Sequence, residues 1–434
     1  MLSEELKQRL VASSENLVHI VVVGTKPDII KQAPLIHELK KQNKLFLVCH
    51  TGQHYDYASS EGALNEFGLT VDINLEINAG SLPDKLAGIA EKFGGLISEI
   101  KDLGKTPVPY VHGDTLTASA AALGSAYSRV PLAHVEAGLR TLSPRSEIFK
   151  RHLQNFNAGT FSFEDYRADL ENRENYEIGS YEPYPEQIDT RLVDQISGFK
   201  FAPVELNRDM LVNEQQGTDT NIYVVGNTIA DAVALSLARG SDFTVPFEDY
   251  LLFSVHRRET CEDETRFRMV YEAIIDLTKS GNHAIIIKLA MFAQAMDKFL
   301  TETEKDELKN NENILLLDPL ARHSDFLKLM QNARLVVADS GGIQEEATVM
   351  GVKQVTLRFG SDRPETLFSG HNILAPLIGK DFIRAVIENS LTVENPSAPL
   401  YGKDVSAKML DIVDNHFAPS RIFLSEEQKF FGQN

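Results

Sequence analysis

The chain alternates short apolar runs, rich in Val, Ile and Leu, with longer segments whose apolar residues recur at helical spacing. In the first part the runs are "LVHIVVVG", "KLFLVCH", "PVPYVHG" and "VPLAHVE", and helical patterns such as "IIKQAPLIHELKK" and "LTASAAALGSAYSR" lie between them. Continuous apolar runs of this kind are typical of strands that are buried on both faces of a parallel sheet. The pattern therefore predicts βαβ units.

A second series of such runs begins after about residue 217 and consists of "NIYVVGN", "YLLFSVH", "HAIIIKL", "NILLLDP", "RLVVADS" and "VKQVTLR". A chain of 434 residues is too long for one compact core. We therefore predict an α/β protein with two doubly wound parallel-sheet domains, at 1–215 and 216–395. We expect residues 396–434 to form a helical segment that packs back on the first domain.

Residues 142–184 interrupt the alternation. This segment is rich in charge and in Tyr and Phe, favours short helices, and contains no strand-like run. It is interpreted either as a surface insertion or as a lid over a cleft, since long ordered loops in enzymes are often functional.

Composition excludes several classes of protein. The formal net charge of −19 argues against nonspecific binding to nucleic acid or to an anionic membrane surface. Two distant cysteines, Cys49 and Cys261, suggest neither a disulfide framework nor a zinc site, and no other metal-ligand cluster is apparent. The N-terminus reads as an amphipathic helix and no apolar run is long enough to cross a bilayer, so we expect a cytoplasmic protein.

The stretch "ARLVVADSGGIQEEA" carries the most specific chemical signal. If a helix begins near Gly342, then Ser340, Gly341 and the helix N-terminus can bind a phosphate. Two carboxylates one turn later would repel a bare phosphate, whereas Glu345 or Glu346 can accept hydrogen bonds from a ribose diol. A nucleotide satisfies both demands. The alternative is a tight turn with acidic residues that suit the first turn of a helix.

Further polar residues end the predicted strands of the first domain. "GTKPDIIK" places Lys26 and Lys31 after the first strand, without a dinucleotide-binding or P-loop fingerprint, and such lysines are often only solvated. Asp114 follows another strand, where it could instead cap the next helix. Glu136 has no such alternative role.

Other candidates follow the insertion and the first strand of the second domain. "PYPEQIDTR" supplies Glu186, Asp189 and Arg191. "YLLFSVHRRET" supplies His256 beside Arg257 and Arg258. A histidine next to arginines suits a diphosphate, to which it could donate a proton as the phosphate departs. Carboxylates would then transfer protons on a sugar attached to that diphosphate.

The motifs together resemble those of the UDP-N-acetylglucosamine 2-epimerase family. They are, in order, "GTKPDIIKQAPL", "TGQHYDY", "HGDTLT", "HVEAGLRT", "PEQIDTR", "VVGNTIAD", "HRRET", "DSGGIQEEA" and "DRPET". The resemblance covers roughly residues 18–376, apart from the insertion. It implies a GT-B-like fold of two Rossmann-type domains that face a central cleft, and inversion of C2 of a UDP-linked N-acetylhexosamine without a redox cofactor or metal.

The family mechanism implies removal of the C2 proton, anti elimination of UDP to give a 2-acetamidoglucal, and re-addition of UDP. Carried over by motif, Asp114, Glu136 and Glu186 match the catalytic acids, and His256 assists the departing diphosphate. Spacing does not decide which acid removes the C2 proton. The implied substrate contacts are Lys26, Lys31, Arg257, Ser340, Gly341, Gly342 and Glu346. The resemblance also implies a homodimer and a role in polysaccharide biosynthesis.

The sequence departs from the family pattern at several positions. Lys26 occupies a position where the family usually has Arg, and a lysine cannot bind an anion in the bidentate geometry of an arginine. Thr190 occupies a second such position, and Arg191 lies one residue later. "KLAMFAQAMD" replaces a His-x-Asn-Pro loop, and Asp56 replaces a Gln, both in the allosteric substrate site, so we expect no activation by substrate.

Three functions remain open at this point. The first is a UDP-N-acetylglucosamine 2-epimerase. The second is a member of the same family that acts on another UDP-hexosamine, such as UDP-2,3-diacetamido-glucuronic acid, or that hydrolyses the intermediate. The third is a GT-B glycosyltransferase or an inactive sugar-nucleotide binder, which would not need the three acids together.

Overall fold

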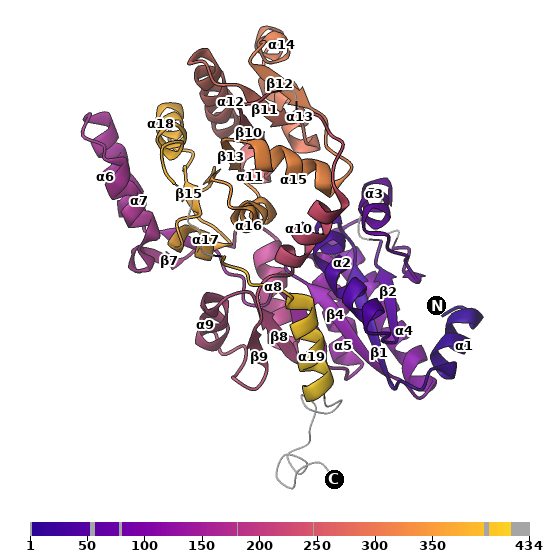
Figure 1. Ribbon diagram of the computed structural model, residues 1–434. Helices are drawn as coiled ribbons and strands as arrows, with labels where there is room; N and C mark the ends of the chain where they lie inside the picture. The colour runs from indigo at the N-terminus through magenta and orange to yellow at the C-terminus, as the bar shows by residue number, and fades with distance from the viewer. Residues whose placement is uncertain are drawn as a thin grey trace. The chain divides into compact units, whose positions relative to one another are not determined.

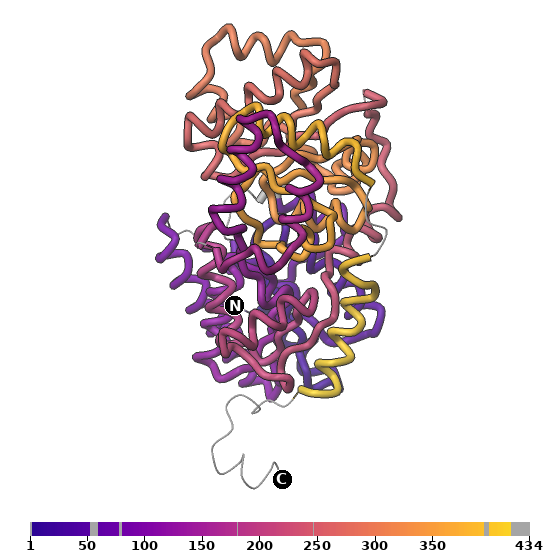
Figure 2. Tube along the Cα trace, turned by 90° about the vertical axis from the view of Figure 1, so that its left-hand side faces the viewer, coloured from indigo at the N-terminus to yellow at the C-terminus, as the bar shows by residue number. Residues whose placement is uncertain are grey.

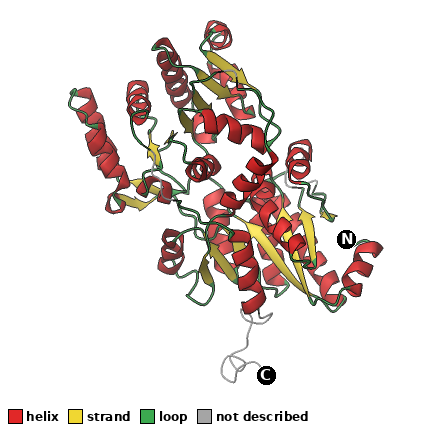
Figure 3. Cartoon of the chain, in the orientation of Figure 1, coloured by secondary structure: helices red, strands yellow, loops and turns green. Residues whose placement is uncertain are grey.

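The computed structural model describes residues 2–52, 57–77, 80–179, 181–245, 247–394 and 399–417. Within these residues the chain forms two compact units. Unit 1 contains residues 2–139, 181–235 and 401–417, and unit 2 contains residues 140–179 and 236–400. Each unit is built on one parallel sheet with helices on either side of its strands (Figures 1 and 3).

The sheet of unit 1 has the strand order β3-β2-β1-β4-β5-β8-β9, and all of its pairs are parallel. Its strands are β1 (Leu17–Val23), β2 (Phe46–His50), β3 (Ile73–Asn74), β4 (Thr106–His112), β5 (Ala133–Val135), β8 (Phe199–Ala202) and β9 (Ile222–Val224). Along β1, Ile20 and Val22 join one apolar cluster while Val21 and Val23 join another. The strand is therefore buried on both faces, which explains its continuous apolar run.

Helices cover both faces of this sheet. They are α1 (Glu4–Ala12), α2 (Lys26–Lys41), α3 (Tyr57–Phe67), α4 (Leu82–Asp102), α5 (Leu116–Tyr127), α8 (Glu186–Ile196), α9 (Glu205–Asn213), α10 (Thr228–Arg239) and α19 (Val405–His416). Helix α2 begins with a capping box, in which Thr25 and Asp28 exchange side chain and backbone hydrogen bonds. Helix α19 packs against α2, and its Val405, Met409 and Val413 join the same apolar cluster as Val21.

The sheet of unit 2 has the order β12-β11-β10-β13-β14-β15, again with parallel pairs throughout. Its strands are β10 (Leu251–Ser254), β11 (Ala284–Ile287), β12 (Ile314–Leu317), β13 (Leu335–Ala338), β14 (Gln354–Thr356) and β15 (Asn372–Leu374). Its helices are α11 (Arg258–Cys261), α12 (Glu264–Lys279), α13 (Ala290–Phe299), α14 (Glu302–Asn310), α15 (His323–Asn332), α16 (Gly341–Met350), α17 (Pro364–Phe368) and α18 (Lys380–Ser390). Both sheets thus have the Rossmann-like order, in which the strand order reverses next to the first strand.

Residues 140–179, here called the arm, contain β6 (Leu142–Pro144), α6 (Ser146–Asn157), α7 (Phe163–Glu171) and β7 (Tyr176–Ile178). The residues that flank the arm belong to unit 1, but the arm itself packs on unit 2. Its helices lie beside α18, where Tyr166 and Phe161 contact Phe382 (Figures 1 and 2).

Six strands differ from the sequence-based expectations. The run "NIYVVGN" was expected to open the second domain, but β9 pairs with β8 at the edge of the first sheet. The segment 142–184 was expected to contain no strand, but β6 and β7 form an antiparallel pair. Strands β3, β8 and β15 were not predicted. Strands of two to four residues have little periodicity from which to recognise them, and strand pairing depends on distant residues.

The predicted fold class is confirmed: the protein is α/β, with two Rossmann-like domains built on parallel sheets. The strand runs of both series were placed correctly apart from the differences above. None of the helices in the described part of the chain combines the length and apolar character that a membrane crossing requires.

Candidate active site

The predicted site residues of unit 1 follow three neighbouring strands of its sheet. Lys26 opens α2 after β1, Asp114 follows β4, and Glu136 follows β5. The order of strands reverses between β1 and β4, and ligands of open parallel sheets bind beyond the carboxyl ends of strands at such a reversal. Glu186 is the first residue of α8, which packs against α5.

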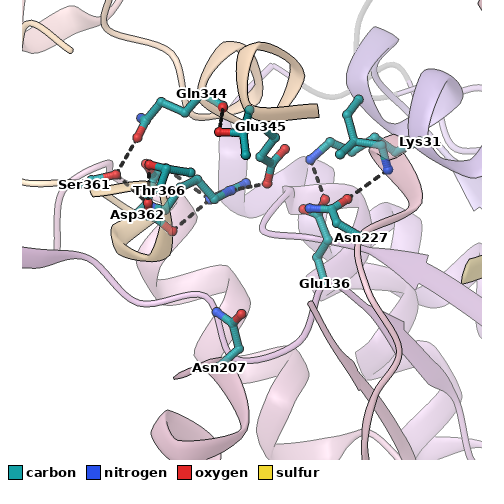
Figure 4. A network of polar contacts seen from close by, with 12 residues as sticks. Lys31, Glu136, Asn207, Asn227, Gln344, Glu345, Ser361, Asp362 and Thr366 are labelled. Carbon is teal, nitrogen blue, oxygen red and sulfur yellow. Dashed lines mark hydrogen bonds and ion pairs between the residues drawn. The ribbon is translucent and has the colours of Figure 1, made fainter. Parts of the chain in front are cut away.

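Glu136 lies in a buried row of alternating charges. Its Oε1 is 2.5 Å from Nζ of Lys31 (Figure 4). Its Oε2 is 3.3 Å from Nε2 of His112. His112 Nδ1 in turn lies 3.5 Å from Oδ1 of Asp28. Burial would lower the pKa of His112, but the carboxylates of Glu136 and Asp28 raise it to about 9. The row therefore compensates the charge of the Glu136 carboxylate on two sides.

The backbone of Glu136 is held in an uncommon conformation. Its φ of 65° lies in the left-handed region, which costs a residue other than glycine about 1 kcal/mol or more. Two residues later, Gly138 has a φ of 84°, and a Cβ there would lie 2.4 Å from the carbonyl oxygen of Asn207. The turn after β5 is thus fixed by close packing, and with it the direction of the Glu136 side chain.

Asp114 does not serve as the helix cap that was considered as its alternative role. The N-cap of α5 is Thr115, whose hydroxyl oxygen accepts a hydrogen bond from the backbone N–H of Ala118. Asp114 precedes the cap in a turn and is half-buried. Its carboxylate is therefore not required for helix capping.

Asp189 forms a carboxyl cluster with Asp114 and Glu186. It is buried on α8, and the hydroxyl of Ser119 lies 2.6 Å from its Oδ1. Burial raises the pKa of Asp189 to about 7, the Ser119 hydrogen bond opposes this rise, and the charges of Asp114 and Glu186 add to it. A carboxyl group that holds a proton near neutral pH therefore lies beside two predicted catalytic acids.

The other predicted cations of unit 1 have different environments. Lys31 is buried with Glu136, whereas Lys26 is half-buried. Arg191 donates to the carbonyl oxygen of Gln187 and lies over the ring of Tyr181, so it is held beside its own helix. The motif residue Asp56 lies outside the described residues.

In unit 2, the "DSGG" motif spans the turn after β13 and the first two residues of α16. Ser340 occupies the N-cap position, but its hydroxyl makes no capping hydrogen bond. A Cβ on Gly342 would meet no atom within 4 Å, so local packing does not explain the glycine. The helix N-terminus thus has no side-chain cap from Ser340 and has open space at Gly342, which together suit an anion.

Asp339, at the end of β13, holds the turn after β10. Its carboxylate accepts hydrogen bonds from the backbone N–H groups of His256 and Arg257, at 3.0 Å and 2.9 Å. Burial lowers the pKa of His256, with Asp339 and Glu259 opposing this and Arg257 adding to it. His256 is therefore neutral near pH 7. Arg258, in contrast, is exposed on α11.

A cluster of arginines surrounds Asp362 in the loop after β14. Burial opposes ionisation, but Arg358, Arg363 and Arg257 hold the pKa of Asp362 well below its usual range. Arg358 donates to Oδ1 of Asp362 at 2.8 Å, and Nη2 of Arg257 lies 4.0 Å from Oδ2. A Cβ on Gly341 would lie 3.0 Å from the same Oδ2, which places Asp362 beside the start of α16.

The two adjacent glutamates of α16 have different roles. Glu345 is fully buried and its carboxylate accepts a hydrogen bond from Arg363 (Figure 4). Glu346 is slightly exposed, and its Oε1 lies 2.9 Å from Nε2 of His323. His323 Nδ1 lies 2.8 Å from the hydroxyl of Ser236. Glu345 is thus used by the fold, whereas Glu346 is the one of the two that keeps some exposure.

Sequence reasoning missed several residues of these clusters. His112 and Asp28 were not singled out, although both lie in motifs that were quoted. Asp362 and Arg363 lie in "DRPET", which was also quoted, but nothing in the sequence links Arg363 to Glu345. His323 carried no signal, because a lone histidine at the start of a helix is unremarkable without its partner.

Comparison with known proteins identifies the family. The family model described as UDP-N-acetylglucosamine 2-epimerase matches residues 37–154 and 177–414, so the unmatched residues between them lie inside the arm. The UDP-N-acetylglucosamine 2-epimerase of Methanocaldococcus jannaschii is 32% identical over 381 residues, which cover 84% of this chain and 90% of that protein. The Escherichia coli K12 enzyme of the same name is 29% identical over 383 residues, covering 85% and 88%.

Solved structures agree with this assignment. The structure of the M. jannaschii enzyme in complex with UDP-GlcNAc and UDP has a TM-score of 0.74 and 28% identity, and covers 92% of this chain and 99% of that one. The Neisseria meningitidis enzyme bound to UDP-GlcNAc has a TM-score of 0.72 and 25% identity, with 92% and 100% covered. The chain therefore belongs to the UDP-N-acetylglucosamine 2-epimerase family and is an epimerase.

Proposed function

We propose that the protein interconverts UDP-N-acetylglucosamine and UDP-N-acetylmannosamine by inverting C2 of the sugar. Family membership supports this, as do relatives whose structures contain UDP-GlcNAc. The single observation that carries the proposal is the Glu136 carboxylate, which is buried at the end of β5 between Lys31 and His112. A protein that only binds a nucleotide through unit 2 would not need a buried, charge-compensated carboxylate in unit 1.

The reaction is an anti elimination followed by an addition. A base takes the hydrogen from C2, its bonding pair forms the C1=C2 double bond, and the C1–O bond breaks with its pair going to UDP. The 2-acetamidoglucal then receives a proton at C2 on the opposite face, and a diphosphate oxygen of UDP bonds to C1. One proton leaves and one returns, so no redox cofactor is required by this balance.

Carboxylates of unit 1 handle the protons in this proposal. Asp114, Glu136 and Glu186 are the groups that exchange protons with C2 or stabilise the charge that develops there. The ionised state of Glu136 is favoured by Lys31 and His112, whereas Asp189 holds a proton near neutral pH. Carboxyl groups whose proton affinities are pushed apart in this way suit acid and base roles.

Residues of unit 2 hold the departing and returning UDP. The N–H groups at Gly341 and Gly342 and the hydroxyl of Ser340 receive the diphosphate. His256 donates a hydrogen bond to it, and the incoming negative charge opposes the effect of burial on this imidazole. Arg257 adds positive charge, and Glu346 accepts hydrogen bonds from the ribose. Lys26 provides a further positive charge from the start of α2.

A second candidate is an epimerase of the same family that acts on another UDP-hexosamine, such as UDP-2,3-diacetamido-glucuronic acid. It is favoured by "PEQIDTR", where Asp189 and Thr190 are buried polar residues at positions that differ from the family pattern. Altered residues next to the proposed catalytic acids could contact a sugar substituent that UDP-N-acetylglucosamine lacks.

Incubation with UDP-N-acetylglucosamine in D2O, followed by NMR, tests the proposal. Deuterium at C2 together with UDP-N-acetylmannosamine is the expected result. Free N-acetylmannosamine and UDP would instead establish the hydrolysing reaction. Exchange only with a different UDP-hexosamine would select the second candidate, and no exchange with any of these substrates would contradict an epimerase site built on these residues.

Family membership also motivates two proposals on the state of the protein in the cell. We expect a homodimer, which light scattering of the purified protein measures directly. We also expect a cytoplasmic enzyme that supplies activated sugars for polysaccharide synthesis.

A further inference from the structure

The arm makes backbone hydrogen bonds to the loop that carries the arginine cluster. The N–H of Leu142 donates to the carbonyl oxygen of Ser361 at 2.9 Å, and the N–H of Ser361 donates to the carbonyl oxygen of Leu142 at 3.0 Å. Two reciprocal bonds of this kind fix the register of both segments. The loop backbone is thus paired with β6 directly next to Asp362.

Side chains add to this contact. A Cβ on Gly360 would lie 2.3 Å from the hydroxyl oxygen of Ser143 and 2.7 Å from the carbonyl oxygen of Leu142, so the two segments are closely packed. The ring of Phe149 on α6 meets that of Phe359 edge to face, with centroids 6.2 Å apart. The arm therefore contacts three consecutive residues of the loop.

The arm is itself anchored on the body of unit 2. The hydroxyl of Tyr166 donates to the carbonyl oxygen of Leu374 at 2.8 Å, and the ring of Tyr166 packs on Phe382. Tyr176 packs edge to face on Phe368 of α17, with ring centroids 4.8 Å apart. These contacts lie on β15, α17 and α18, outside the loop itself. They give the arm a fixed base from which it can hold the loop in place.

The braced loop leads directly to the predicted diphosphate site. The hydroxyl of Ser361 donates to Oε1 of Gln344 at 2.6 Å and accepts a hydrogen bond from the N–H of Arg363 at 2.9 Å (Figure 4). Asp362 lies beside Gly341, and Arg257 lies next to Asp362. A shift of Ser361 would therefore displace the charged groups around the start of α16.

We propose that the arm is a brace that positions the loop of residues 358–363 for binding of the UDP diphosphate. The inference rests on the proposed function for its ligand, but its structural part concerns only contacts within unit 2. In this proposal Phe149 and Leu142 are positioning residues that act through Phe359 and Ser361. Misplacement of a binding or catalytic group by about 1 Å can greatly reduce the rate. A segment that does not touch the ligand can therefore affect the reaction by fixing the position of groups that do.

Two variants weaken the brace and one serves as a matched control. Phe149→Ala removes the ring contact with Phe359, and Gly360→Ala forces the loop away from β6. Tyr250→Phe, the control, removes a buried tyrosine hydroxyl that donates to the carbonyl oxygen of Leu329 in unit 2, outside both the arm and the loop. All three change unit 2, so a general loss of stability would affect the control as well.

Two measurements on the full-length protein test the brace. The first is hydrogen–deuterium exchange of residues 358–363 without ligand, in which we expect faster exchange at Ser361 in Phe149→Ala and Gly360→Ala and an unchanged exchange rate in Tyr250→Phe. The second is calorimetric titration with UDP, in which we expect an affinity about three- to tenfold weaker for the first two variants, the size of a lost aromatic contact.

The outcomes separate this inference from the proposed function. Unchanged exchange at Ser361 in both brace variants would overturn the brace. Equal loss of UDP affinity in Tyr250→Phe would also overturn it, because the effect would then be one of general stability. If the wild-type protein does not bind UDP, the proposed function fails, and the exchange measurement still decides whether the arm holds the loop.

Discussion

Nζ of Lys31 lies 2.5 Å from Oε1 of Glu136, and both side chains are buried although they are 105 residues apart in the sequence. Desolvation makes such a pair costly to form, and removal of one partner leaves the other buried charge with less compensation. The pair thus joins the start of α2 to the end of β5. It also sets the charge at the predicted proton-transfer site.

We predict that the double variant loses less free energy of unfolding than the sum of the losses in Lys31→Met and Glu136→Gln. Each single change removes the nearest opposite charge from a buried group, at a cost of up to about 3 kcal/mol, whereas Lys31→Met/Glu136→Gln removes both charges. Urea unfolding of the four proteins gives the coupling free energy. Additive effects would show that the pair is not coupled in the folded protein.

The three acids are predicted to be needed together. Asp114→Asn, Glu136→Gln and Glu186→Gln keep the size of each side chain, and each should lower kcat by about a hundredfold or more, the lower range for acid–base groups. Glu174→Gln, at an exposed residue of the arm, is the control and should have the activity of the wild type. Near-normal turnover in all three acid variants would exclude the mechanism.

Asp189 should make the stability of the folded protein depend on pH near neutrality. Burial raises the pKa of Asp189 to about 7, so the folded protein binds this proton more tightly than the unfolded chain does. The stability of the folded state therefore decreases as pH rises from about 4 to about 7, and the cost is complete above that range. Asp189→Asn removes the cost.

Thermal unfolding at two pH values measures this effect. The gain in Tm of Asp189→Asn over the wild type should be greater at pH 8 than at pH 5, by about 2 °C or more. Ser119→Ala should move the titration to higher pH, because the Ser119 hydrogen bond lowers the pKa of Asp189. The wild-type kcat should show an inflection near pH 7 that Asp189→Asn lacks. A gain in Tm that is independent of pH would mean that Asp189 is ionised throughout.

The sequence was sufficient to predict the ends of the strands, and with them most of the candidate site. Glu136, His256 and Ser340 follow runs that are buried on both faces, so the parallel sheet and the chemistry at its edge could be inferred together. The number of ordered motifs then indicated the family. Local patterns suffice for such features because they depend only on neighbouring residues.

Pairings between distant residues were beyond sequence reasoning. Which of Glu345 and Glu346 remains available to a ligand depends on Arg363. This arginine is distant in sequence and donates a hydrogen bond to the carboxylate of Glu345. The allocation of β9 to the first sheet depends on β8, and the three-residue strands of the arm have no period to detect. These features are decided by tertiary contacts, which a single sequence does not display.

His323 should tune the recognition of ribose through Glu346. Its Nε2 lies 2.9 Å from Oε1 of Glu346, and its other ring nitrogen lies next to Ser236, so the imidazole is held from both sides. His323→Ala should release the carboxylate and raise KM for the UDP-sugar by about three- to tenfold, the value of one hydrogen bond to a charged group, with little change in kcat. Glu346→Gln should raise KM at least as much. The double variant Glu346→Gln/His323→Ala should raise KM no further, because both changes act on one contact.

Steady-state kinetics with the UDP-sugar and with the matching 2′-deoxyuridine diphosphate sugar test this prediction. The variants should lose their preference for the ribose form, and an unchanged preference would remove Glu346 from the ribose site.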